Sequence, residues 1–298
     1  MDRTKSLLTL VEGRMRQSTC PFPGSDRPVD RAVLHHLEAG GGRIRALMCL
    51  HASLSLALSD ETSVILATAC ELLHNASLLQ DDVFDREATR RGVASVWQEY
   101  GETVAICAGD LVLSSAFSTL ADLREITHIA PAIHLAFRHA RTVIVSQGTE
   151  LNASPTTLAE YEALALGKSS SLLTLPLHLP LSMSGHQASM PLAQRVTDSF
   201  AAAYQIADDL EDYAQDRSVG ALNVVSILTD IAGLDLDHAH AVATCRAIEL
   251  LHNCIHDATS LPGDCAAVML QHACTMLQKL EVDALTGDLH SRSLHYVG

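Results

Sequence analysis

"LLQDDVFDREATRRG", residues 78–92, places three aspartates within five positions and follows them with two arginines and a glycine. Asp81 and Asp85 are four residues apart, so on a helix they lie on one face, one turn apart. Asp82 points about 100° away from them, given roughly 3.6 residues per turn. Repulsion between these carboxylates leaves two interpretations: a solvated helix edge, or a pair of ligands for a hard cation.

A second cluster, "YQIADDLEDYAQD" at residues 204–216, repeats the pattern. Asp208, Asp212 and Asp216 form a stripe along one helix face, with Asp209 beside it. A single cluster of this kind is most often a solvated face, but two of them, each ending an apolar helix, favour an oxygen-rich site if they face each other. Mg²⁺ takes about six oxygen ligands and usually shares its shell with substrate phosphates. The chemistry this indicates is the metal-assisted departure of a diphosphate.

Loss of a diphosphate would leave an allylic carbocation, which needs a dry pocket without nucleophiles. The helices that lead to both clusters are apolar, over residues 64–79 and 200–207. Apolar helices suit a lipid-like substrate, and they are equally natural as ordinary core helices. Both interpretations stay open.

The composition predicts an all-α protein. The chain has 298 residues, of which 48% are hydrophobic and 4% aromatic, and strand-type alternation is nearly absent. The formal net charge of −15 argues against a nucleic-acid partner, because binding to the phosphate backbone needs basic patches. An anionic small substrate is still compatible with this charge if Mg²⁺ mediates the contact.

Cysteine usage and the chain start indicate the compartment. The eight cysteines are scattered without a C-x-x-C pair, which favours cytosolic thiols over disulfides or a zinc site. No signal peptide is expected, and the most apolar stretch, residues 172–183, is too short to span a bilayer and carries two prolines. We therefore expect a soluble, cytoplasmic protein.

Glycine, proline and capping residues divide the chain into about ten helices. Asp60 is expected to cap the helix that ends in the first acidic cluster. The helix from residue 157 is expected to bend near Pro176 and Pro180. No repeat or linker is visible, so residues 1–298 are expected to form a single domain. The expected helices cover residues 4–18, 29–39, 45–58, 60 to the first cluster, 102–123, 127–149, 157 onward and 191–216, with three shorter ones within 222–285.

Over roughly residues 35–230, these motifs resemble those of the trans-isoprenyl diphosphate synthases, the polyprenyl synthetase family. "ELLHNASLLQDDVFDREATRRG" and "YQIADDLED" resemble its two aspartate-rich motifs. Other similar blocks are "GGGRIRA" (40–46), "YGETVAICAGDLVLSSAF" (100–117), "QGTE" (147–150) and "GKSSSL" (167–172). The resemblance implies an all-α isoprenoid synthase fold, a single domain of helices around a deep central cavity. It also implies that the protein forms a homodimer. Within the family, the chain is most similar to a short-chain geranylgeranyl diphosphate synthase.

The resemblance also implies a reaction. An allylic diphosphate (dimethylallyl, geranyl or farnesyl) would ionise with the help of three Mg²⁺ ions. The resulting cation would alkylate isopentenyl diphosphate, and the released diphosphate would then accept a proton. An enzyme of this kind is a trans-prenyltransferase of isoprenoid and terpenoid biosynthesis.

Carried over residue by residue, the resemblance predicts the site. Asp81, Asp85 and Asp208 would bind the metal directly. Support for the metal, directly or through water, would come from Asp82, Asp209, Asp212 and Glu150. The allylic diphosphate would be held by Arg90 and Lys168, and isopentenyl diphosphate by Arg45, Arg91 and His74, with Arg43 a further substrate-binding candidate. Ser169 and Gln205 would point oxygen dipoles at the developing cation, so that Lys168, Ser169 and Gln205 form the catalytic group.

The residues themselves agree with part of this. His74 lies seven positions before Asp81, two turns back on the same helix face, so it can reach the same site. By itself it is equally natural as a core or surface histidine. Arg90 and Arg91 alone would be read as ion-pair partners of the acidic cluster, which contribute little at a surface. Next to diphosphates, the planar fork of arginine suits the oxygens.

The chain departs from the family at three positions. Gly42 stands where the first basic motif has a lysine, and Ala46 stands where it has a proline. Ala221 stands where a lysine follows the second acidic cluster, and Arg217 could replace it only if the loop folds back. A charge-assisted hydrogen bond contributes roughly 1.5–3 kcal/mol, so the two missing lysines predict weaker substrate binding.

Two other functions stay open. One is a non-catalytic or regulatory subunit of a heteromeric prenyl synthase, although such subunits typically lose aspartates of the second cluster, and all are present here. The other is a class I terpene cyclase or head-to-head condensing enzyme. Cyclases of that kind pair one aspartate cluster with an Asn-Ser-Glu type motif and lack the downstream Arg-Arg-Gly.

Two small residues bear on product length. Ala76 and Ser77 lie five and four positions before Asp81. In the family, aromatic side chains at these positions stop chain growth at fifteen carbons. Small residues leave that space open, so we expect at least twenty carbons, with Leu72 and Leu73 or the helix around Cys107 and Leu111 closing the next level. The expected product is geranylgeranyl diphosphate.

Overall fold

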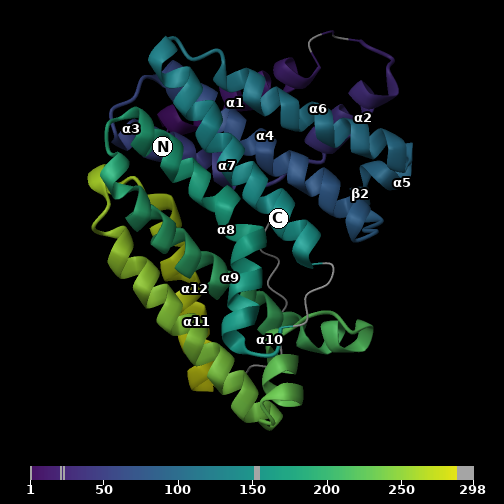
Figure 1. The fold of residues 1–298 in the computed structure, drawn as a ribbon, viewed down its shortest axis with the longest axis vertical. Helices are drawn as coiled ribbons and strands as arrows, with labels where there is room; N and C mark the ends of the chain where they lie inside the picture. The colour runs from purple at the N-terminus through teal and green to yellow at the C-terminus, as the bar shows by residue number, and fades with distance from the viewer. Residues whose placement is uncertain (1, 21, 23, 151–154, 287–298) are drawn as a thin grey trace. The chain divides into compact units, whose positions relative to one another are not determined.

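The protein is almost entirely helical in the computed structural model, which confirms the all-α prediction. The structure describes residues 2–20, 22, 24–150 and 155–286, and only the backbone at 2, 149, 150, 168, 169, 285 and 286. The chain forms two compact units (Figure 1). Of the described residues, unit 1 holds those within 2–138 and 175–187, and unit 2 holds those within 139–174 and 188–286. One domain over residues 1–298 stays a prediction.

Unit 1 contains most of the N-terminal helices. They are α1 (Asp2–Thr19), α2 (Pro28–Glu38), α3 (Ile44–Ser55), α4 (Asp60–Phe84), α5 (Val96–Tyr100) and α6 (Glu102–Leu120), with the first part of α7 (Ile126–Glu150) and the second part of α8 (Leu158–Met183). A pair of two-residue strands, β1 (Thr89–Arg90) and β2 (Val93–Ala94), follows α4.

The first acidic cluster lies at the end of α4, the central helix of unit 1. The hydroxyl of Ser59 accepts a hydrogen bond from the Thr62 N–H at 3.2 Å, so Ser59 is the N-cap. The prediction that Asp60 caps this helix is wrong, because Asp60 is its first residue and pairs with Arg3 at 2.7 Å. An acidic residue there still favours the helix through the macrodipole.

Burial along α4 explains its stability. Its large apolar side chains are at most 2% exposed at Ile65, Leu66, Leu72 and Leu79. Truncating a side chain of this kind to alanine costs roughly 2–5 kcal/mol. Helix α6 packs along α4, and Gly109 lies at this contact: a Cβ added there would meet Gln80 at 3.5 Å and Leu79 at 3.8 Å, which is ordinary van der Waals contact.

Two of these helices pass a composition test for membrane spans. Among the described residues, α4 and α6 are long and apolar enough to cross a bilayer, with 78% and 44% of their apolar windows buried. A core helix of a globular protein has the same length and composition. Burial of α4 therefore accounts for its apolar character within the fold.

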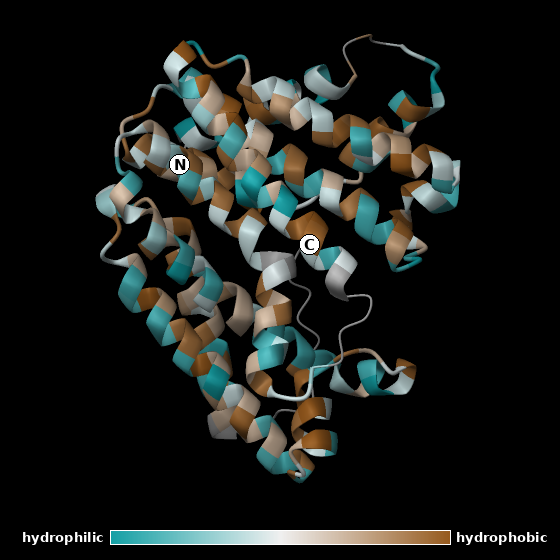
Figure 2. Cartoon of the chain, viewed as in Figure 1, coloured by the Kyte–Doolittle hydropathy of each residue, from teal (hydrophilic) through white to brown (hydrophobic). Residues whose placement is uncertain are grey.

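Unit 2 is built around the helix that carries the second acidic cluster. Its elements are the rest of α7 and α8, then the last two residues of η1 (Gln187–Ser189), α9 (Met190–Val219), α10 (Val224–Ser226), the π-helical turn η2 (Ile227–Ile231), α11 (Leu236–Ala258), η3 (Pro262–Asp264) and α12 (Ala267–Thr286). Helices α9 and α11 pack along each other, and α12 contacts both. Figure 2 shows hydrophobic and hydrophilic residues alternating around α11, as its apolar stripe requires. Three short helices were expected after residue 222, but α11 has 23 residues and α12 has 20.

Candidate active site

The first acidic cluster divides between two sides of α4. His74, Ser77 and Asp81 are partly exposed and Asp85 is exposed, whereas Asp82 is only 1% exposed. These four positions are three or four residues apart, so they follow one helix face. We call this partly open face of the helix the α4 stripe.

A tight hairpin returns Arg90 to Asp82. Arg91 (φ 53°) and Gly92 (φ 80°) form its two-residue loop, and positive φ at both positions matches the right-handed twist of the strands. The Arg90 guanidinium donates to Asp82 Oδ1 at 2.6 Å. Burial nevertheless raises the pKa of Asp82 against the effect of Arg90, and Oδ2 has no hydrogen-bond partner among the described residues. Asp82, a predicted metal ligand, is therefore held by an arginine of its own chain.

Arg45 and His74 form a contact beside the exposed stripe. Arg45 Nη1 lies 3.0 Å from His74 Nε2. An arginine can only donate, so Nε2 accepts and the proton of the neutral imidazole is on Nδ1. Burial and then the charge of Arg45 lower the pKa of His74 well below its usual value. Two residues predicted to bind isopentenyl diphosphate therefore lie together.

Arg91 docks onto the glycine loop before α3. Its Nη1 donates a hydrogen bond to the carbonyl oxygen of Gly40. A Cβ on Gly41 would lie 2.5 Å from Cζ of Arg91, so only glycine allows this approach. The loop "GGGRIRA" thus brings Arg91 close to the segment that carries Arg45.

Arg43 differs from the other arginines of this group. It is 8% exposed, and its guanidinium donates to the carbonyl oxygens of Leu37 at 3.1 Å and Gly40 at 3.1 Å, and to Glu12 at 3.3 Å. These contacts engage Arg43 with the chain itself. A direct contact between Arg43 and substrate stays a prediction.

The second acidic cluster presents two aspartates to solvent. Asp208 and Asp212 are both exposed on α9. Protein atoms packed around Asp208, and then the charges of Asp212 and Asp209, raise the pKa of Asp208 to about 6. The pKa of Asp212 is also raised, first by the protein atoms packed near its carboxylate and then by the charge of Asp216. Accumulated negative charge of this kind is relieved by a cation.

Asp209 points the other way and is 3% exposed. Its Oδ2 accepts from the Tyr161 hydroxyl at 2.7 Å and from the Val224 N–H at 2.6 Å, and its Oδ1 accepts from Gln205 Nε2 at 3.0 Å. Both oxygens are therefore occupied by protein donors. In unit 2, Asp209 joins α8 and α10 to α9, and Gln205 contacts it through its amide nitrogen.

The loop around Ala221, which stands where the family has a lysine, is anchored to α9 by Asn223. Its Nδ2 donates to the Asp209 carbonyl at 2.8 Å and to the Asp216 carboxylate at 2.9 Å. Arg217, considered above as a replacement, lies 3.3 Å from Asp230 and over the ring of Tyr213. Arg217 is therefore engaged on the surface of unit 2.

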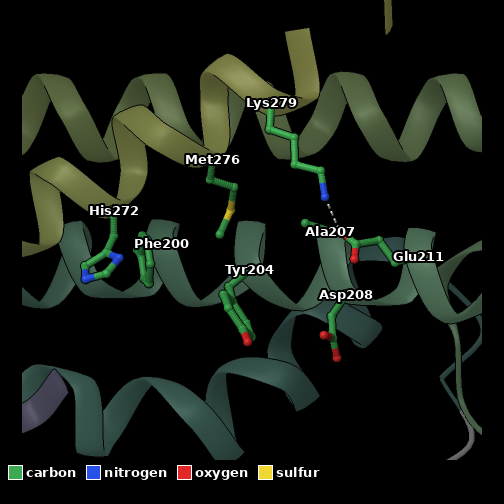
Figure 3. A pocket seen from close by; sticks show the side chains of 8 residues that line it. All are labelled: Phe200, Tyr204, Ala207, Asp208, Glu211, His272, Met276 and Lys279. Atoms are coloured by element: carbon green, nitrogen blue, oxygen red, sulfur yellow. Dashed lines mark hydrogen bonds and ion pairs between the residues drawn. The ribbon is translucent and has the colours of Figure 1, made fainter. Parts of the chain in front are cut away.

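A groove in unit 2 lies between α9 and α12 (Figure 3). Phe200, Tyr204 and Asp208, spaced four apart on α9, line it together with Met276 of α12. At one end, Lys279 of α12 pairs with Glu211 at 2.8 Å, and at the other lies His272. The groove is apolar along its floor and acidic at Asp208.

Some predicted residues lie outside the described side chains. These are Glu150, Lys168 and Ser169, of which only the backbone is described, within α7 and α8. The two predicted chain-length residues are described and differ: Ala76 is 2% exposed, whereas Ser77 is partly exposed on the α4 stripe.

The sequence interpretation missed residues that hold the site together. They are His36, Glu71, Asn75, Tyr161 and Asn223. One signal was available, since a glutamate and an asparagine within the apolar run "ACELLHNASLL" must be paired if that helix is buried. Tyr161 and Asn223 carried no such signal, because their partners lie far away in the sequence.

Magnesium fits the acidic side chains by donor type. Carboxylate oxygens are its preferred protein ligands, and Asp81, Asp85, Asp208 and Asp212 present such oxygens at exposed or partly exposed positions. In the part of the chain that the structure describes, no three His, Cys, Asp or Glu side chains are already gathered as a metal site. A shell completed by substrate phosphates does not need three protein ligands in one place.

Comparison with known proteins gives the family. The polyprenyl synthetase family model matches residues 26–225. An octaprenyl diphosphate synthase of Haemophilus influenzae is 27% identical over 87% of this chain and 80% of its own length. A farnesyl diphosphate synthase of Geobacillus stearothermophilus is 30% identical over 61% of this chain and 65% of its own length, so the chain spans just under two thirds of that relative.

Solved structures agree on the fold. A geranylgeranyl pyrophosphate synthetase from the archaeon Geoglobus acetivorans superposes with a TM-score of 0.80 at 21% identity, covering 93% of this chain and 98% of that one. A decaprenyl diphosphate synthase from Rhodobacter capsulatus gives 0.77 at 19% identity, covering 94% and 96%. The resemblance inferred from the two aspartate-rich motifs is thereby confirmed: the chain belongs to the polyprenyl synthetase family and is a trans-prenyltransferase.

Proposed function

We propose that the protein condenses isopentenyl diphosphate with an allylic diphosphate in a Mg²⁺-dependent reaction. The observation that carries the proposal is the group formed by Arg45, His74 and Arg91 beside the α4 stripe that bears Asp81. Arginine side chains fixed by their own chain suit the recognition of a diphosphate. A neutral His74 adds a donor at Nδ1 without adding charge.

The chain's own residues would bind and orient the two substrates. Arg45, Arg91 and His74 would hold isopentenyl diphosphate, and Arg90 and Lys168 would hold the allylic diphosphate. Gln205 and Ser169 would direct oxygen dipoles at the carbocation, although the nitrogen of Gln205 is on Asp209. Bound Mg²⁺ supplies neutralisation of the charge on the leaving diphosphate.

The carboxylates divide into two groups in this proposal. Asp81, Asp85, Asp208 and Asp212 are exposed or partly exposed, and we assign Mg²⁺ binding to them. Asp82 and Asp209 are buried and hydrogen-bonded to protein donors, so we assign them to positioning. Glu150 keeps its predicted supporting role.

The comparisons leave the product length open, because the names of the relatives give products of different lengths. The names of the matched proteins include octaprenyl, farnesyl and geranylgeranyl synthases. Support for a twenty-carbon product comes from Ser77, a small side chain on the same stripe as Asp81. We propose geranylgeranyl diphosphate, made from dimethylallyl, geranyl or farnesyl diphosphate.

We also propose a homodimer formed through α6. Ile106 is 50% exposed on this helix, and Leu113 and Phe117 are partly exposed along the same side. An apolar stripe of this kind is typical of a subunit interface. A cytoplasmic location stays a prediction.

The absent lysines at Gly42 and Ala221 favour a second candidate, a regulatory subunit that needs a catalytic partner. One assay distinguishes the two candidate functions. The purified protein is incubated with isopentenyl diphosphate, Mg²⁺ and each allylic diphosphate in turn, and the dephosphorylated products are identified by mass spectrometry. Geranylgeraniol supports the proposal, and inactivity with every primer supports the subunit.

A further inference from the structure

A buried carboxylate lies one turn before His74 on α4. Glu71 is 1% exposed and is surrounded by the apolar core of unit 1. Burying a charge costs several kcal/mol unless it is paired and hydrogen-bonded. Glu71 must therefore have partners that offset this cost, and those partners indicate its role.

The principal partner of Glu71 is the first turn of α3. Its Oε2 accepts the backbone N–H of Ala46 at 3.0 Å. Ala46 is the third residue of α3, so this N–H is among the four that no carbonyl of the helix can satisfy. A carboxylate is also favoured there by the helix dipole. Glu71 thus holds the start of the helix that carries Arg45.

The second partner of Glu71 is the arginine that orders the glycine loop. Arg43 Nη1 lies 3.9 Å from Glu71 Oε1 and 3.1 Å from the Gly40 carbonyl, which also accepts from Arg91. The backbone of Arg43 has a positive φ of 50°, which is strained for a residue other than glycine. The contacts of its side chain hold the backbone in this conformation. One buried network therefore connects Glu71 to both Arg45 and Arg91.

Asn75 secures Glu71 from the other side. Its Nδ2 donates to the Glu71 carbonyl at 2.7 Å and lies 3.5 Å from Oε1. Its Oδ1 accepts from Nε2 of His36, on α2, at 3.0 Å. The network thus ties α2, α3 and α4 together around the loop of residues 40–46.

We infer that Glu71 is the positioning residue of the isopentenyl diphosphate subsite. It fixes the loop and the start of α3 so that Arg45, His74 and Arg91 meet one diphosphate, and it does not touch the substrate itself. Because Gly42 supplies no cation, binding depends on the orientation of the arginines that remain. This inference rests on the proposed function of the site.

The test is a kinetic comparison of Glu71→Gln with the wild type. Glutamine keeps an oxygen for the Ala46 N–H but removes the charge that faces Arg43. We expect KM for isopentenyl diphosphate to rise about 10-fold, with kcat and KM for the allylic substrate changed less than about 2-fold. Arg43→Gln should reproduce this pattern if the two side chains act together.

Thr68→Val is the matched control. Thr68 is also fully buried on α4, but its hydroxyl donates to the Val64 carbonyl of its own helix at 2.7 Å. Urea unfolding of each variant gives the loss of stability. An equal rise of KM in Thr68→Val, or a uniform change of all kinetic constants in Glu71→Gln, would overturn the positioning role.

The inference can fail separately from the proposed function. A wild type that makes no product contradicts the proposed function. Binding of inorganic diphosphate to wild type and Glu71→Gln, measured by calorimetry in the presence of Mg²⁺, then tests the positioning role alone. Weaker binding by the variant supports it, and equal binding overturns it.

Discussion

The hydroxyl of Tyr161 donates a 2.7 Å hydrogen bond to Asp209, whereas the neighbouring Asp208 is exposed on the other side of α9. Adjacent aspartates of one motif therefore have different surroundings. Asp209 is a buried acceptor for three protein donors. Asp208 is an exposed carboxylate whose pKa is raised to about 6 by nearby protein atoms and then by neighbouring negative charge.

Asp209→Ala is expected to destabilise the protein by roughly 2–4 kcal/mol, because it leaves the Tyr161 hydroxyl and the Val224 N–H buried without an acceptor. Urea unfolding measures the loss. Asp212→Ala, an exposed neighbour, should change stability by less than about 0.5 kcal/mol. Similar losses for both variants would contradict the separation of roles.

Gly41→Ala should weaken the binding of isopentenyl diphosphate. The new Cβ would meet the Arg91 guanidinium, which is flexible enough to move away without unfolding the protein. Gly40→Ala is the control, since Gly40 also has a positive φ but a Cβ added there would meet no atom within 4 Å. KM for isopentenyl diphosphate should rise more in Gly41→Ala, and equal effects would show that backbone strain alone is responsible.

The buried His36 should make the folded protein less stable in acid. Burial, and then the charge of Arg91, lowers the pKa of His36 to about 3, so it stays neutral in the folded protein, while the unfolded chain takes up a proton below about pH 6.5. Stability is therefore present above pH 6.5 and lost as the pH falls toward 3. Between pH 7 and 5 this histidine alone should lower the free energy of unfolding by about 2 kcal/mol. His36→Gln should unfold in urea with a shallower pH dependence, and an unchanged slope would contradict this account.

Ser77→Phe should shorten the product to fifteen carbons, because Ser77 is on the partly exposed stripe of α4 with Asp81. Ala76→Phe should instead reduce stability by about 1–3 kcal/mol, since Ala76 is 2% exposed and packs inside unit 1. Product analysis and thermal unfolding of both variants distinguish the two effects. Shortening by Ala76→Phe alone would place the chain-length limit on the other side of the helix.

The helices and the two acidic motifs could be predicted from the sequence, because apolar periodicity and local spacing are carried by neighbouring residues. The α4 helix was expected to end in the first cluster and does so at Phe84. Its cap was misassigned because Ser59 and Asp60 are both good capping residues, and only the hydrogen bond to Thr62 distinguishes them.

The different surroundings of similar side chains could not be predicted. Asp208 and Asp209 have the same chemistry, and their burial depends on Tyr161 of another helix. Arg43 and Arg45 likewise differ only through contacts to residues that lie elsewhere in unit 1. Which of two similar side chains is buried depends on tertiary packing, and no local pattern in the sequence shows it.

Turnover by two aspartate variants tests the central claim most directly, namely that the exposed carboxylates of both motifs serve a Mg²⁺-dependent condensation. Asp81→Asn and Asp208→Asn are assayed for condensation of isopentenyl diphosphate with farnesyl diphosphate at saturating Mg²⁺, beside Glu99→Gln and Asp237→Asn as exposed controls from each unit. We predict that kcat falls by a factor on the order of 10²–10³ in both aspartate variants and stays near the wild-type value in the controls. Near-normal rates in either Asp81→Asn or Asp208→Asn would contradict the account.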